Sequence, residues 1–233
     1  MDSLTLRLIV YSIFLICCIV AFILRFFRPA VKNMFFEFEI FAFWGSMVYY
    51  LVMVVVDLLR VTLNKTFDNV SNFFNQKVFK FVWACEMTAG LGYWGAVILH
   101  GMQYTKGNGA DAFLMFYYHL IIQIFLIVDL FLFNHTLETS YLADFITITV
   151  IYLVLGLYIC ICNWCGLRSP IYWFLGWEFD KIFVIGVIFY MLLLNMYFLH
   201  QLLLMKKMNV TFGTTTVTEM SSVTRKGKTD TFV

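Results

Sequence analysis

The sequence predicts an all-α fold: a bundle of about six transmembrane helices followed by a disordered C-terminal tail. The first observation is composition, because 62% of the 233 residues are hydrophobic and only 13% are charged. Globular domains average about 45–50% apolar and about 25% charged residues. The second is the occurrence of runs of roughly 20 apolar residues, the length a helix needs to cross a hydrocarbon core of about 30 Å. The six runs are Leu8–Phe27, Phe38–Leu59, Val78–Gly101, Ala112–Phe133, Ala143–Asn163 and Asp180–Leu204.

The first run, Leu8–Phe27, is expected to be a retained helix and not a cleaved signal peptide. Only one basic residue, Arg7, precedes it, and no small-residue cleavage site follows. The chain continues instead through Arg25, Arg28 and Pro29, which close the helix.

Residues at the ends of the other runs support their assignment to helices. The second run ends near Asp57 and Arg60, and the sixth is closed by Lys206 and Lys207. The turn-like segment Lys106–Gly109 opens the fourth run. The third run contains glycines that allow close helix packing: Gly90, Gly92 and Gly95.

The remaining segments predict loops and a tail. Arg60–Lys77 is the longest internal loop and is rich in Asn, whereas Leu167–Glu178 carries the Trp and Tyr residues typical of a membrane interface. The end of the chain is rich in Thr and Ser and has too little apolar surface to order itself. We therefore expect a transmembrane domain at residues 1–205 and a flexible, cytoplasmic tail at residues 206–233.

Composition also excludes several classes of protein. A net charge of only +2 argues against a strongly basic nucleic-acid binder, and 20% aromatic residues argue against intrinsic disorder of the whole chain. The six cysteines lie mainly in apolar runs, which does not suit a disulfide-stapled secreted domain. Cys160, Cys162 and Cys165 have no second pair or histidine cluster to complete a zinc site. We expect no metal and no cofactor.

The orientation of the chain follows from its basic residues. Six spans put both termini on one side, which carries ten Lys and Arg residues against six on the other, so the termini are expected in the cytoplasm. Glycosylation sequons at Asn64, Asn69, Asn134 and Asn209 fall on the same side and argue for the opposite orientation. The expected location is the endoplasmic reticulum or the plasma membrane, with several passes.

Polar residues inside the apolar runs are candidate functional residues, because a titratable group in a transmembrane helix costs a few kcal/mol. Asp57, Asp129 and His200 lie close to helix ends, so anchoring at the membrane interface also explains them. Glu86 lies deeper and is expected to pair with Lys80 or with a neighbouring helix. The candidates are Asp57, Glu86, His119, Asp129, Asn195 and His200.

His119 and Ser46 form the candidate catalytic pair. His119 lies about 10 Å into its helix, where a histidine serves either as a neutral interhelical hydrogen-bond donor or as a general base. Its own helix offers only tyrosine hydroxyls and Gln123 as partners. Ser46 lies at a similar depth in a helix that enters from the same side, whereas Thr88 is nearer the opposite leaflet. Ser46 is otherwise explained as a packing residue.

Several motifs resemble the androgen-induced and androgen-dependent TFPI-regulating protein family. They are the segment Phe41–Ser46 followed by an apolar stretch to Asp57, the spacing of His119 and Asp129, and Ile171–Glu178 before the last helix. The similarity of order and spacing covers roughly residues 8–205. The resemblance implies a multi-pass membrane hydrolase that cleaves fatty acid esters of hydroxy fatty acids with an intramembrane threonine and histidine.

The resemblance places the histidine at His119 and the threonine at Ala42, and alanine has no hydroxyl with which to attack an ester. Ser46 lies four residues later, on the same helix face and one turn deeper. We therefore expect Ser46 to act as the nucleophile, His119 to take its proton, and a polar group on a neighbouring helix to hold the oxyanion.

Two other functions fit parts of the sequence. The C-terminal residues Thr231, Phe232 and Val233 suit strand addition to a PDZ-type groove, which favours a non-enzymatic membrane scaffold or a receptor-like protein. A transporter or proton pathway would use the acidic and histidine residues named above, but the sequence shows no internal repeat. The expected partners are membrane lipids, a fatty acid ester substrate and a PDZ domain, with no nucleic acid.

Overall fold

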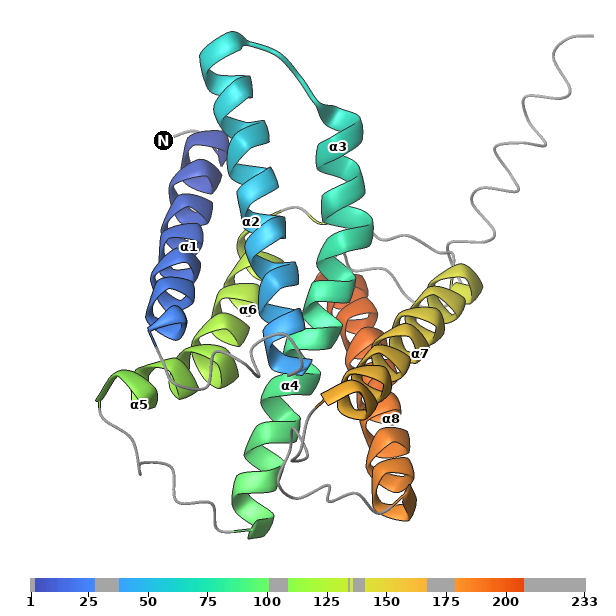
Figure 1. Cartoon of the computed structure of the whole chain (residues 1–233). Coiled ribbons are helices and arrows are strands. Elements are labelled where there is room, and N and C mark those ends of the chain that lie inside the picture. Colours follow the sequence, from blue (N-terminus) through green and yellow to red (C-terminus); the bar gives the residue numbers. More distant parts are fainter. Residues whose placement is uncertain are drawn as a thin grey trace, which may run out of the picture.

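The computed structural model describes residues 3–27, 38–100, 109–133, 135, 141–166 and 179–207, and within these ranges its regular elements are all helices. The prediction of an all-α fold is therefore confirmed for this part of the chain. The elements form six continuous helical segments there, one for each predicted run (Figure 1). They are α1 (Ser3–Phe26), α2 (Phe38–Leu63), α3 (Asp68–Phe73) with η2 (Phe74–Val78) and α4 (Phe79–His100), α5 (Gly109–Phe116) with η3 (Tyr117–Ile121) and α6 (Ile122–Leu132), α7 (Tyr141–Gly166), and α8 (Phe179–Lys207).

Helix α2 and the segment after it extend further than the sequence predicts. Most of the predicted loop Arg60–Lys77 is helical, so this prediction is wrong beyond the short turn at residues 64–67. Asp68 lies in the first turn of α3, where a carboxylate favours the helix dipole, and it accepts a hydrogen bond from Arg60 at 3.2 Å. Asn64 adopts a positive φ of 51°, a conformation that asparagine tolerates.

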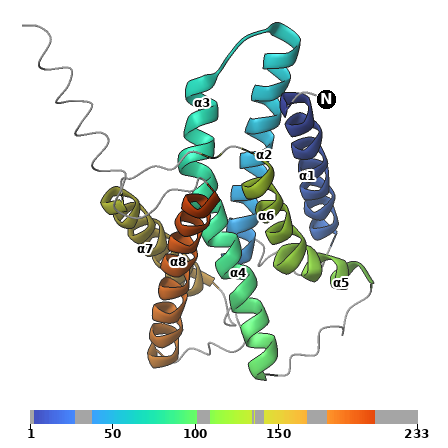
Figure 2. The ribbon, with the colours of Figure 1, turned by 180° about the vertical axis from the view of Figure 1, so that it is seen from behind.

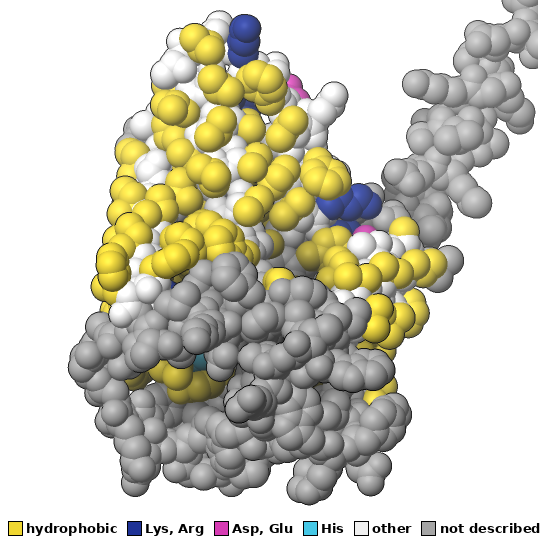
Figure 3. Space-filling model, viewed as in Figure 1, with side chains coloured by type: hydrophobic (Ala, Val, Ile, Leu, Met, Phe, Trp, Pro, Cys, Tyr) yellow, Lys and Arg dark blue, Asp and Glu magenta, His cyan; other side chains and the backbone are white. Residues whose placement is uncertain are grey.

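Four helices of the described residues are long and apolar enough to cross a membrane: Leu4–Phe26, Ile40–Leu63, Phe113–Leu132 and Gly186–Lys207. Hydrophobic side chains cover much of the described surface in Figure 3. On α1 they recur every three to four residues, from Ile9 and Ile13 to Ile16, Val20 and Ile23, and all are exposed. Such a surface is costly in water and suits contact with lipid.

The other two predicted spans form helices but are not among these four. Within the described residues, the apolar part of α7 is the shorter stretch Ala143–Val154. Helix α4 packs against α2, α6 and α8 (Figure 2). Its charged residues Lys80 and Glu86 are both buried. Charged side chains that are buried between helices do not face lipid.

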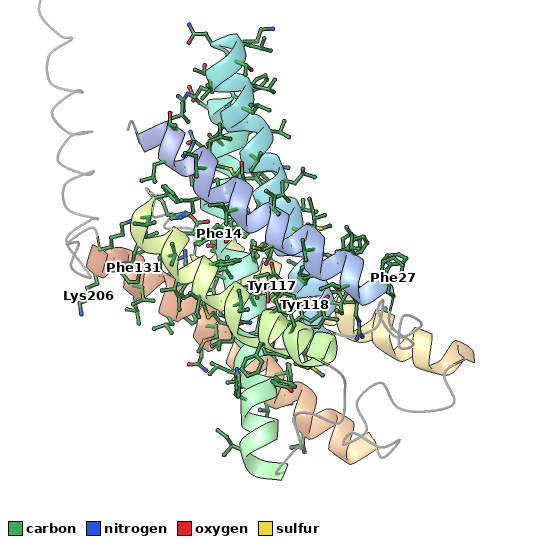
Figure 4. All side chains as sticks on the ribbon, turned by 90° about the vertical axis from the view of Figure 1, so that its left-hand side faces the viewer. Phe14, Phe27, Tyr117, Tyr118, Phe131 and Lys206 are labelled. Atoms are coloured by element: carbon green, nitrogen blue, oxygen red, sulfur yellow. The ribbon has the colours of Figure 1, made fainter. Side chains whose placement is uncertain are left out.

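Aromatic rings fill the main core between α1, α2, α4 and α6. Phe14 stacks on Phe125 with ring centroids 4.1 Å apart, and Phe43 meets Tyr118 edge to face at 5.1 Å. Figure 4 shows Phe14, Tyr117 and Tyr118 within this part of the bundle, whereas the exposed Phe27 and Phe131 lie at its outside. Aromatic pairs of this geometry contribute about 0.5–1.5 kcal/mol beyond their buried area.

Two π-helical turns interrupt otherwise α-helical segments. η2 connects α3 to α4, and η3 connects α5 to α6. Helix α5 lies at a marked angle to α6 in Figure 1, so η3 is the place where this segment bends. A π-helical turn changes the hydrogen-bond register and is frequent at functional sites.

Candidate functional site

Ser46 forms its shortest hydrogen bond with a buried carboxylate. Its hydroxyl donates to Oε1 of Glu86 at 2.7 Å, and the carbonyl oxygen of Ala42 lies 3.3 Å away as a second acceptor. Ser46 is 0% and Glu86 1% exposed. A serine hydroxyl held by a carboxylate in a low-dielectric bundle is a polar pair with the geometry for proton transfer.

The sequence of α2 explains why Ser46 faces α4. Ala42, Ser46, Tyr49, Tyr50 and Met53 recur at the spacing of one helix face, and all are buried. The small residue beside Ser46 permits a close approach, because a Cβ on Gly45 would lie 3.4 Å from the side chain of Val82.

The partner of Glu86 is on a neighbouring helix. From the sequence, Glu86 could pair with Lys80 or with a residue of another helix. In the structure, Glu86 accepts a hydrogen bond from the hydroxyl of Ser46 on α2. Lys80 forms a buried ion pair with Asp144 of α7, and the hydroxyl of Tyr197 on α8 donates to the same carboxylate.

His119 lies in the π-helical turn η3 and packs against α4. Its ring stacks on Tyr93 with centroids 3.7 Å apart and an interplanar angle of 3°, and it interacts with the backbone of Ala89. The carbonyl oxygen of His119 accepts a hydrogen bond from Nε1 of Trp94 at 2.7 Å. These contacts hold both the ring and the backbone of His119 against one stretch of α4.

Gln123 connects the π-helical turn to the Ser46 pair. Its Nε2 donates to the carbonyl oxygen of Tyr118 at 2.9 Å and to that of Glu86 at 3.1 Å. The sequence places Gln123 four residues after His119 as a partner for the ring, but its amide instead reaches the carbonyl of the residue five positions back.

Replacing Gly90 with valine should weaken the contact between α4 and α6. A Cβ at position 90 would lie 3.0 Å from Nε2 of Gln123, so a branched side chain displaces the amide from both carbonyls. We expect a loss of about 1–3 kcal/mol in the free energy of unfolding, measured by SDS titration of the purified protein followed by circular dichroism. Gly95→Val is the matched control, because nothing lies within 4 Å of a Cβ there. Equal losses in both variants would contradict the proposed clash with Gln123.

Ser46 and His119 both pack on α4, at positions 86 and 89–93, but they do not bond each other directly. Among the described residues, the hydrogen bonds of the Ser46 hydroxyl go to Glu86 and Ala42. Glu86 therefore lies beside the Ser46 hydroxyl, in the position that the sequence analysis expected for His119. That Ser46 and His119 are catalytic stays a prediction.

The other candidate residues have structural partners. Asp57 pairs with Arg7 of α1 through two hydrogen bonds, of 2.8 and 2.5 Å. Thr88 donates to the carbonyl of Ala84, and the exposed Asn195 donates to that of Met191. The described residues contain no group of three or more His, Cys, Asp and Glu side chains that could hold a metal ion.

A second polar cluster lies between the N-terminal half of α1 and the C-terminal end of α6. The sequence indicated only some of its residues. Oδ1 of Asp129 accepts a hydrogen bond from the hydroxyl of Tyr11 at 2.8 Å and lies 2.9 Å from Nε2 of His135. His200 packs its ring near Phe79. His135 lies two residues after the end of the fourth apolar run, and this position was the sequence signal that could have identified it.

Some predictions concern parts of the chain that lie outside the described residues. They are the side chains of Cys160, Cys162 and Cys165, the loop Leu167–Glu178 with its motif Ile171–Glu178, the sequons at Asn134 and Asn209, and the C-terminal residues from 208 to 233.

No family model, curated protein or solved structure matches this chain.

Proposed function

We propose that the chain is a polytopic membrane protein whose six helical segments cross the bilayer. Four of the helices have the length and apolar composition of membrane spans. The remaining two segments pack against them, and two of their buried charges, Lys80 and Asp144, pair with each other. Successive segments run in alternate directions in Figure 1, as consecutive spans must.

Within this framework, the proposed activity is hydrolysis of a lipid ester with Ser46 as the nucleophile. The observation that carries the proposal is the 2.7 Å hydrogen bond from the Ser46 hydroxyl to Glu86. The resemblance to the androgen-induced family suggests the substrate class, fatty acid esters of hydroxy fatty acids. Ala42 lacks the hydroxyl of that family, and Ser46 supplies one a helical turn further on.

In the proposed reaction, Glu86 takes the proton of Ser46 while Oγ attacks the carbonyl carbon of the ester. The ester C–O bond then breaks, and the proton goes to the departing alkoxide, which leaves as an alcohol. Water hydrolyses the acyl-serine to release the fatty acid and restore the hydroxyl. His119, which packs on the adjacent turns of α4, is the second acid–base group of the proposal.

Labelling with a fluorophosphonate probe tests the proposal, because the probe reacts with an activated serine. We expect the purified wild-type protein to be labelled and Ser46→Ala to lose all labelling. Thr88→Val is the matched control, since Thr88 is also a buried hydroxyl bonded to the carbonyl four residues earlier but donates to no carboxylate within the described structure. Unchanged labelling of Ser46→Ala would refute Ser46 as the nucleophile.

One observation favours a second candidate, a non-enzymatic membrane scaffold. Ser46, Glu86 and Thr88 are all buried, as are polar residues that only tie helices together. A scaffold would bind a PDZ domain through Thr231, Phe232 and Val233. Under this alternative the wild-type protein takes up no fluorophosphonate, and Ser46→Ala affects stability alone.

A further inference from the structure

The Ser46–Glu86 pair is closed off from the bilayer, although the proposed substrate is a lipid ester. Ser46 is 0% and Glu86 1% exposed, so an ester cannot reach the serine hydroxyl in this conformation. The proposed function therefore requires part of the bundle to move aside for the substrate, as lids and loops do in many enzymes. The contacts around the pair indicate which part this is.

The π-helical turn η3 covers the turn of α2 that precedes Ser46. Phe43, three residues before Ser46, is buried, and its ring meets that of Tyr118 of η3 with centroids 5.1 Å apart. The side-chain amide of Gln123 joins the backbone of Tyr118 to that of Glu86. Because η3 packs on both α2 and α4, it lies against the two helices that carry the pair.

Helix α5 continues η3 at the edge of the bundle, beside the C-terminal end of α1 (Figure 1 and Figure 2). Within the described structure it packs mainly on η3 and α1. Its side chains Phe113, Met115 and Phe116 are exposed, so this helix already presents an apolar surface to lipid. A short helix with few partners opens at a lower free energy than the central helices of a bundle do.

We propose that α5 and η3 (Gly109–Ile121) form a lateral gate, through which a lipid ester enters from the bilayer to reach Ser46. Two hydrogen bonds of η3 hold the gate closed. Nε1 of Trp94 on α4 donates to the carbonyl oxygen of His119 at 2.7 Å, and the hydroxyl of Tyr117 donates to Sγ of Cys18 on α1 at 3.1 Å. Opening breaks both bonds, and closure behind the substrate returns His119 to its place against α4. This inference rests on the proposed function.

The native thiol of Cys18 reports the opening of the gate independently of catalysis. Cys18 is 0% exposed and is bonded by the Tyr117 hydroxyl, so N-ethylmaleimide reaches it when η3 moves outward. The full chain in nanodiscs is treated with N-ethylmaleimide, and mass spectrometry follows the alkylation of each cysteine. We expect Cys18 of Trp94→Phe to be alkylated about 2–10-fold faster than that of the wild type, because the loss of one hydrogen bond shifts the opening equilibrium by this factor.

Trp83→Phe is the matched control for the loss of an indole. Trp83 is also buried on α4, but its N–H has no hydrogen-bond partner within the described residues, so this change removes no bond that closes the gate. Cys85 of α4 packs with residues of α7 and α8 and serves as the reference for general loosening of the bundle. The gate is overturned if Cys18 reacts no faster in Trp94→Phe than in Trp83→Phe, or if Cys85 accelerates equally.

The fluorophosphonate probe connects the opening to the serine. Labelling of Ser46 should rise in Trp94→Phe together with alkylation of Cys18, since both reagents use the same opening; faster alkylation without faster labelling would overturn the gate. The gate and the chemistry fail separately. A labelled wild type with an unresponsive Cys18 keeps the reactive serine and refutes the gate, whereas a responsive Cys18 in a protein that takes up no fluorophosphonate keeps the opening of η3 and refutes the hydrolysis.

Discussion

Replacing Asp144 with alanine should lower the free energy of unfolding of the bundle by about 3–5 kcal/mol. Asp144 of α7 forms an ion pair with Lys80 of α4 and accepts a hydrogen bond from the hydroxyl of Tyr197 on α8. One carboxylate therefore connects three helices. The side chains of Lys80 and Asp144 are 1% and 3% exposed. Without the carboxylate, the buried ammonium loses its counter-charge where water cannot replace it. Contacts of Lys80 with the rings of Phe81 and Tyr197, at 5.9 and 5.8 Å, offset only about 0.5–2 kcal/mol.

The measurement is SDS-induced unfolding of the purified protein, followed by circular dichroism. Asp68→Ala is the matched control: Asp68 also accepts from a basic residue, Arg60, but it is 60% exposed, and such pairs contribute about 0–1 kcal/mol. The double variant Lys80→Met with Asp144→Leu should recover most of the loss, because it removes both charges together. If Asp144→Ala is no less stable than Asp68→Ala, the pair does not hold the three helices together.

The pattern of apolar runs predicted the helical segments well, because a helix of about 20 apolar residues has few competing structures. The ends of the helices were harder to predict. Polar residues such as Asp57 and Arg60 marked the expected end of α2, yet the helix continues to Leu63 because Asp57 is paired with Arg7 inside the bundle. Tertiary partners thus decide whether a charge ends a helix or is buried within it.

The partners within the candidate site could not be predicted from sequence. A depth argument places Ser46 and His119 at the same level, but it says nothing about the rotation of each helix about its axis. The π-helical turn at His119 changes that rotation, and no residue pattern signals it. Glu86, 40 residues from Ser46 in the chain, became its partner only through the packing of α2 on α4. The pairing of Lys80 with Asp144, 64 residues away, has the same origin.

Replacing Glu86 with glutamine should reduce kcat for ester hydrolysis by about 10²–10⁴-fold, the usual contribution of a general base. The amide has the size of the carboxylate, and its oxygen can still accept a hydrogen bond from the Ser46 hydroxyl in place of the one of 2.7 Å to Glu86. It cannot take the serine proton, because an amide is a very weak base. The change therefore separates the chemical role of Glu86 from its role in packing, which replacement with alanine would not do.

The assay measures hydrolysis of a fatty acid ester of a hydroxy fatty acid by the purified wild-type protein, by Glu86→Gln and by Thr88→Val. SDS unfolding of the same samples shows whether the bundle is intact. Thr88→Val should keep its activity, because Thr88 bonds only a backbone carbonyl within the described structure. His119→Gln completes the set, since it removes the second acid–base group of the proposed reaction. Full activity of Glu86→Gln together with an inactive His119→Gln would assign the proton transfer to the histidine, and Glu86 would then serve only to position the hydroxyl of Ser46.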